Sequence, residues 1–74
     1  MNLEKIRKRL TGGFRPFVIY TSEGREYEVP HPEFILFGRH DLAVTDKDGD
    51  IAVLDPLHVV AIKHTKPKPD GKPA

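Results

Sequence analysis

The chain has 74 residues, of which 38% are hydrophobic and 31% are charged, a composition typical of one small globular domain and not of a disordered segment. It contains no cysteine, which excludes disulfides, thiol nucleophiles and cysteine-ligated metals. No apolar run approaches the roughly 20 residues that cross a bilayer, and no apolar stretch of a secretory signal follows the basic start. We therefore expect a cytoplasmic protein that does not enter a membrane.

The formal net charge of +1 hides an uneven distribution of charge along the chain. Residues 1–15 carry five basic side chains against one acid, and residues 63–74 carry four against one. Residues 16–62 carry three basic side chains against nine acids. The middle is acidic and both ends are basic, so the ends can contact phosphate groups or the acidic body of a neighbouring copy.

The first element that the sequence predicts is a short helix over residues 2–11. Apolar residues recur there at helical spacing and form one narrow stripe: Leu3, Ile6 and Leu10. Basic residues fall on the opposite face: Lys5, Lys8 and Arg9. Asn2 can cap the start of this helix, and Gly12 with Gly13 can end it, since glycine accepts the left-handed backbone found past helix ends. A helix this short must dock on a core.

A period of two begins at Phe17 and predicts a first hairpin. Residues 17–21 carry apolar side chains on both faces, which is typical of a central strand. Residues 22–25 form a turn with Gly24 at the position that needs positive φ. Residues 26–29 alternate acid and apolar side chains and predict a half-buried partner strand.

The second half of the chain predicts further short strands. The apolar run at residues 34–37 is either a short strand or a helical turn that covers an open end of the core. Residues 42–45 and 51–54 flank an acidic segment containing Asp48-Gly49, and Asp-Gly between β-branched runs is a strong hairpin signal. Residues 59–63 are nearly all apolar and predict a buried last strand.

These elements predict a mostly β fold, a small five-stranded SH3/Sm-like barrel with an N-terminal α-helix over residues 1–63. Closing the strands into a barrel removes free sheet edges. Residues 64–74, rich in lysine and proline, are predicted to be a flexible tail. The predicted core consists of these residues: Leu3, Ile6, Leu10, Phe17, Ile19, Tyr27, Val29, Leu42, Val44, Ile51, Val53, Val60 and Ile62.

The sequence carries no strong motif for a cofactor, a metal or catalysis. The acidic segment 46–50 has its glycine in the fourth place and Leu57 in the twelfth, which does not match a calcium loop. The four histidines lack the spacing of zinc motifs: His31, His40, His58 and His64. The single serine, Ser22, falls in a predicted hairpin turn with no pocket behind it. We expect a non-enzymatic protein without cofactor or metal.

Several segments resemble a family of short uncharacterised bacterial proteins. They are Arg15-Pro16-Phe17, the turn at residues 22–25, Val29-Pro30-His31-Pro32-Glu33, and Leu57-His58-Val59. The resemblance covers about residues 3–63, and the Val-Pro-His-Pro-Glu stretch is its most specific part. The family has no established activity, so the resemblance implies no catalytic residue.

The predicted order of one helix, five strands and a tight turn before the last strand is similar to the Sm-like fold. That fold assembles rings of six or seven copies, by pairing the fourth strand with the fifth strand of a neighbour, and binds RNA. His58 and the apolar residues after it resemble the loop and last strand of the bacterial Sm-like RNA chaperone, where a lysine–histidine pair faces the uridine-binding pore. Leu57 precedes His58 here, so that lysine is absent. The Sm-type asparagine and the arginine–glycine pair are absent as well.

We therefore predict a binding or assembly module, with two hypotheses about its partner. The first is a self-associating protein-interaction domain, because a single core in a chain of this length rarely supplies more than about 3–5 kcal/mol. The second is an Sm-like protein that binds single-stranded RNA. Its candidate nucleic-acid-binding residues are Lys5, Lys8, Arg9 and His58.

Overall fold

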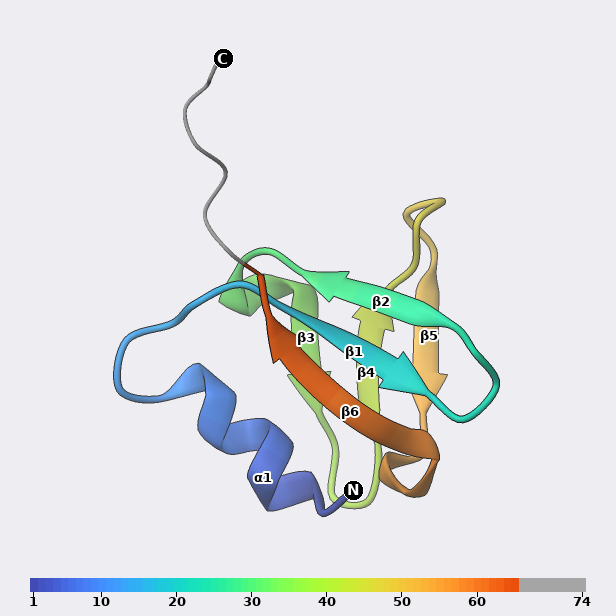
Figure 1. The fold of residues 1–74 in the computed structure, drawn as a ribbon, viewed down its shortest axis with the longest axis horizontal. Helices are drawn as coiled ribbons and strands as arrows, with labels where there is room; N and C mark the ends of the chain where they lie inside the picture. Colours follow the sequence, from blue (N-terminus) through green and yellow to red (C-terminus); the bar gives the residue numbers. More distant parts are fainter. Residues whose placement is uncertain (66–74) are drawn as a thin grey trace.

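The computed structural model describes residues 1–65 (Figure 1). Of the predicted flexible tail, residues 64–74, His64 ends the last strand and the Thr65 N–H donates to the Pro16 carbonyl at 3.0 Å, while residues 66–74 lie outside the described residues. The chain begins with helix α1 (Leu3–Arg7), which continues as the 3-10 helix η1 (Lys8–Leu10). Six strands follow: β1 (Phe17–Thr21), β2 (Glu26–Val29), β3 (Ile35–Phe37), β4 (Leu42–Thr45), β5 (Ile51–Leu54) and β6 (Val59–His64). Two further 3-10 helices, η2 (Pro32–Phe34) and η3 (Pro56–His58), directly precede β3 and β6.

The strands form two antiparallel three-stranded sheets, in the orders β2-β1-β6 and β3-β4-β5. Figure 1 shows the first sheet crossing in front of the second, with α1 beside them. The predicted mostly β fold with an N-terminal helix is confirmed. A closed barrel of five strands is not confirmed, because the apolar run at 34–37 contributes a sixth strand and the described strands separate into two sheets.

The N-terminal helix begins and ends where its capping residues predict. The Asn2 side-chain oxygen accepts a hydrogen bond from the Glu4 N–H at 2.7 Å, which satisfies one free donor of the first turn. The helix tightens into η1 and stops before Gly12 and Gly13, whose φ angles are +73° and +94°. Ile6 is fully buried and docks the helix on the sheets.

The core lies between the two sheets and the helix. Its buried members come from α1, β1, β2, β3, β4 and β6, and they are Ile6, Phe17, Ile19, Tyr27, Val29, Ile35, Leu42, Val44 and Val59. Leu3, Leu10 and Ile62 pack against this cluster while partly exposed. The position of β1 between β2 and β6 also confirms the predicted central strand, and its outward Val18 is only 8% exposed.

Two predicted core residues of β5, Ile51 and Val53, lie on the surface instead. The five-residue turn places Thr45 opposite Ile51, and cross-strand partners share a face. Since Val44 points inward, Thr45 and Ile51 point outward, and Val53 follows with the period of two. The inward positions of β5 are taken by Ala52 and Leu54, which pack on the core.

The third wrong core assignment is Val60, which is 60% exposed because β6 contains an irregularity. Tyr20 pairs with Ala61, but Thr21 pairs with Val59, so β6 has one extra residue at this point. A bulge of this kind shifts the alternation by one residue. Val59 therefore points into the core, where it is 2% exposed, and Val60 points away from it.

Candidate interaction surfaces

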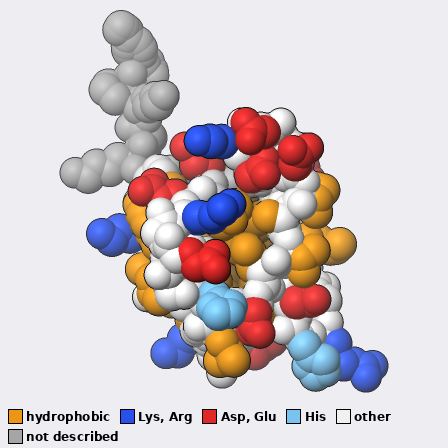
Figure 2. All heavy atoms as spheres, turned by 90° about the vertical axis from the view of Figure 1, so that its right-hand side faces the viewer, with side chains coloured by type: hydrophobic (Ala, Val, Ile, Leu, Met, Phe, Trp, Pro, Cys, Tyr) orange, Lys and Arg blue, Asp and Glu red, His pale blue; other side chains and the backbone are white. Residues whose placement is uncertain are grey.

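An apolar surface covers the outer face of the β3-β4-β5 sheet. Leu36 pairs with Ala43, and Ala43 pairs with Val53, so these three side chains form one row across the sheet. Leu36, Ile51 and Val53 are 71%, 69% and 67% exposed. We call Leu36, Ala43, Ile51 and Val53 the outer apolar face. Hydrophobic side chains gather on the corresponding right-hand margin of Figure 2. Contiguous exposed apolar residues typically mark an interaction surface.

The two ends of the outer apolar face differ in charge. The β4–β5 turn carries three acids and Lys47, and the Asp46 carboxylate accepts hydrogen bonds from the N–H groups of Asp48 and Asp50 at 2.9 and 3.0 Å. The β3–β4 turn carries the exposed Arg39, His40 and Asp41, one basic and one acidic side chain beside a histidine. Figure 2 shows acidic side chains gathered at the top of this view and basic ones at its lower right. The apolar face therefore lies between an acidic end and an end of mixed charge.

A second surface feature is a small hollow of about 230 Å³ beside the connector between η1 and β1. Its charged or ionisable lining residues are Lys8, Arg9, Arg15 and His64, and Thr11, Gly12 and Gly13 complete it. We call it the basic hollow. No carboxylate lines it within the part of the chain that the structure describes. Such a lining attracts anions.

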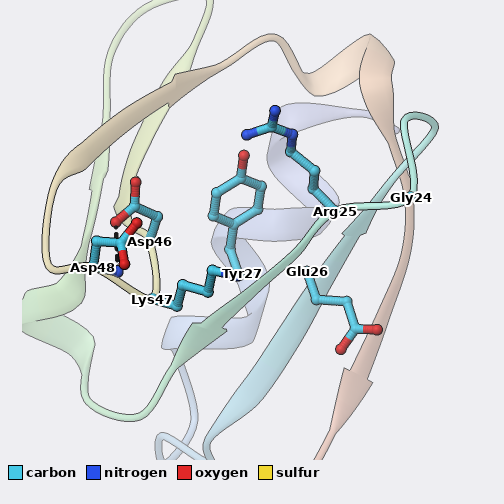
Figure 3. A pocket seen from close by; sticks show the side chains of 7 residues that line it. All are labelled: Gly24, Arg25, Glu26, Tyr27, Asp46, Lys47 and Asp48. Carbon is cyan, nitrogen blue, oxygen red and sulfur yellow. Dashed lines mark hydrogen bonds between the residues drawn. The ribbon is translucent and has the colours of Figure 1, made fainter.

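A larger hollow, of about 500 Å³, lies between the start of β2 and the β4–β5 turn (Figure 3). Figure 3 shows the Tyr27 hydroxyl directed toward the Arg25 guanidinium, with the turn carrying Asp46 and Asp48 on the other side. The lining mixes both signs of charge. Its groups do not converge on one point in Figure 3, so the hollow lacks the constellation that a reaction needs.

The structure separates the predicted nucleic-acid-binding residues. Lys5, Lys8 and Arg9 are exposed along α1 and η1, and the last two line the basic hollow. His58 belongs to η3, where it contacts Ser22 in the β1–β2 turn. In Figure 1 the end of the helix is at the left and the chain at residues 56–58 is at the lower right. The Met1 amino group donates to the Pro56 and Val59 carbonyls, so His58 lies near the start of the helix, and it does not line the basic hollow.

The contact of His58 with Ser22 brings a histidine to the turn that carries the single serine of the chain. The Ser22 N–H donates to the His58 carbonyl at 2.8 Å, and this backbone bond holds the Ser22 Oγ 3.4 Å from His58 Nδ1. The nearby Asp55 carboxylate accepts from the Leu57 N–H at 2.9 Å and caps η3. Among residues 1–65 no carboxylate bonds to the His58 ring, so the third group of a catalytic triad is missing.

Metal ligands do not gather within residues 1–65. No group of three His, Asp or Glu side chains comes close enough to hold an ion there. No helix in this described part has the length and the apolar character needed to cross a membrane.

Sequence reasoning missed several residues of these surfaces. Arg15 and His64 are far apart in the chain, and they meet because the Thr65 N–H donates to the Pro16 carbonyl at 3.0 Å next to the Phe17–His64 strand pair. No pattern of neighbouring residues in the sequence predicts this pairing of the two ends of the described chain. For Ile51 a signal existed, because a turn of five residues after outward-facing Thr45 returns the chain with Ile51 on the same outward face.

Comparison with known proteins adds no relative. No family model, no curated protein and no solved structure matches this chain.

Proposed function

We propose that this protein is a small non-enzymatic β module that assembles with copies of itself through the outer apolar face. The observation that carries the proposal is the exposed row of Leu36, Ala43 and Val53. Burying a side chain of the size of leucine or valine contributes about 1.5–3 kcal/mol. Packing this face would add apolar burial to a domain whose own core is small.

A second copy is the occupant that the charge of the two ends supports. A two-fold arrangement brings the same face of both copies together in opposite directions. The β4–β5 turn of one copy would then lie beside the β3–β4 turn of the other, with its acids facing Arg39 and its Lys47 facing Asp41. The proposal also fits an open, SH3/Sm-like arrangement of strands, because the two sheets leave free edges that a neighbour can cover.

The test is sedimentation equilibrium of the full chain and of two matched valine variants. Val53 and Val60 are 67% and 60% exposed on different sheets, so neither substitution by glutamate removes core packing. We expect wild type and Val60→Glu to form a discrete oligomer and Val53→Glu to have the mass of one chain. A wild-type mass of one chain at every concentration would overturn the proposal, as would equal dissociation of both variants.

As a second candidate function, we propose binding of single-stranded RNA. The observation that favours it is the position of Lys8 and Arg9 together with Arg15 around one hollow without a carboxylate. Contacts with phosphates make the affinity fall as salt is added. The logarithm of the binding constant falls with the logarithm of the salt concentration, with a slope of about −0.7 for each phosphate neutralised on a single strand.

Fluorescence anisotropy with a labelled single-stranded RNA tests this candidate. Charge reversal of Lys5, Lys8 and Arg9 is expected to weaken binding and to flatten its salt dependence. Charge reversal of Lys47, an exposed lysine of the acidic β4–β5 turn, is the control. Unchanged binding by the triple variant would remove the helix from the site.

A further inference from the structure

The basic hollow holds groups that donate hydrogen bonds or carry positive charge. At about 230 Å³ it is smaller than the roughly 300–1,000 Å³ of pockets that enclose a drug-sized ligand. It can therefore take one small group of a larger molecule, or a small ion. The chemistry of its lining decides which group that is.

Three cationic side chains around the hollow have no acidic partner. The one ion pair within residues 1–65 joins Arg7 to Glu4 at 3.5 Å. Lys8, Arg9 and Arg15 form no ion pair with the described part of the chain, and all three are exposed. Their charge is available to an anion, and arginine matches the geometry of phosphate oxygens with two parallel donors.

The backbone of the connector adds two further donors. Gly12 and Gly13 both have positive φ, at +73° and +94°. Their N–H groups donate to no acceptor within residues 1–65, whereas the Thr11 N–H donates to the Lys8 carbonyl at 3.2 Å. A methyl group added at either glycine would meet no atom within 4 Å, so the space beside the connector is open. Successive free N–H groups in a turn form a concave site for an anion.

His64 provides a further and independent observation. Its Nδ1 is buried without a hydrogen-bond partner in the described residues, and its ring stands edge-on to Phe17 with the ring centres 6.0 Å apart. Packing on Phe17 holds the ring at the hollow. This lining residue therefore holds a polar atom that no group of the described residues satisfies.

We propose that the basic hollow binds a phosphate group, with Lys8, Arg9 and Arg15 supplying charge and the N–H groups of Gly12 and Gly13 supplying backbone donors. The phosphate can belong to a single-stranded RNA or to a free phosphate compound, and the shared chemistry is the phosphate oxygens. The inference does not depend on self-association. It deepens the RNA candidate, because it names where the chain would hold the backbone of the strand.

Amide NMR of the full chain tests the site, with inorganic phosphate added at constant ionic strength. We expect saturable shifts of the Gly12 and Gly13 amide signals. Arg15→Gln should weaken the affinity roughly tenfold, the loss expected for one charge-assisted contact. The control is Arg39→Gln, which removes an exposed arginine outside the hollow and should leave the affinity unchanged.

Two results would overturn the site: Gly12 and Gly13 signals that do not respond to phosphate, or equal weakening by both arginine variants. A parallel titration with single-stranded RNA separates the two sources of phosphate. RNA that competes with phosphate at Gly12 and Gly13 supports the site and the RNA candidate together. Phosphate binding without RNA binding supports the site for a free phosphate and contradicts the RNA candidate. RNA binding that leaves both glycine signals unmoved contradicts the site alone.

Discussion

The outer faces of the two sheets are built from different residues although both sheets contain three antiparallel strands. In the first sheet, Val18 lies between Glu28 on β2 and Lys63 on β6. In the second sheet, the equivalent row is Leu36, Ala43 and Val53, with no charged residue. Val18 is 8% exposed, whereas Leu36 is 71% exposed.

The difference between the two sheets arises from long side chains that cover an apolar neighbour. Lysine and glutamate place their carbon chains along apolar surface while their charged ends stay in water. The Lys63 ammonium lies 5.6 Å from the centre of the Tyr20 ring, so Lys63 crosses the outer face of the first sheet. In the second sheet no charged residue stands in the row of Leu36, Ala43 and Val53, and for this reason we propose self-association through that sheet.

The largest expected loss of stability distinguishes a substitution on the inner face of the second sheet from one on its outer face. Leu42 and Leu36 lie on neighbouring strands, and they are 1% and 71% exposed. Leu42→Ala should lower the free energy of unfolding by about 2–5 kcal/mol, because it leaves a cavity in the core. Leu36→Ala should change it by less than about 0.5 kcal/mol. Urea denaturation of dilute samples measures both, and similar losses would contradict the assignment of the faces.

A smaller loss of stability, equal in the two sheets, is expected when the glycine in a hairpin turn of either sheet is replaced. Gly24 in the β1–β2 turn and Gly49 in the β4–β5 turn have nearly the same φ, at +82° and +83°. Replacement of either by alanine strains the left-handed backbone by roughly 1–2 kcal/mol. Thermal unfolding of the two variants should show matched losses. A loss at one turn alone would mean that the other turn relaxes into a different conformation.

The smallest expected loss of stability comes from removing the lysine side chain that lies over the outer face of the first sheet. Lys63→Ala removes the contact with Tyr20 and should lower the free energy of unfolding by about 0.5–1 kcal/mol, as for an exposed cation–π pair. Lys47→Ala removes an exposed lysine of the acidic turn and serves as the comparison. If the two variants have the same stability by urea denaturation, Lys63 does not cover this sheet.

Most elements could be predicted from the sequence because their signals are local. The alternation at Phe17–Thr21, the glycine turns and the Asn2 cap depend on neighbouring residues, and the structure confirms each of them. The run at residues 34–37 had left a strand and a helical turn open, and the structure contains both, because Pro32 starts a 3-10 turn that ends where β3 begins.

The faces of β5 and β6 could not be predicted from hydrophobicity alone. Ile51 and Val53 are large and apolar, so their character favoured the core, but the register with β4 turns them outward. Val60 points outward because of a bulge that depends on the pairing of β6 with β1. The basic hollow likewise requires Arg15 and His64 to meet across the first sheet, which no local pattern encodes.

The most direct test of the central claim is a concentration series of amide NMR spectra of the full chain. The account predicts that the signals of Leu36, Ala43 and Val53 shift as the protein concentration rises, while those of Val18 and Glu28 do not. Spectra that stay the same at every concentration, or shifts confined to the β2-β1-β6 sheet, would contradict it.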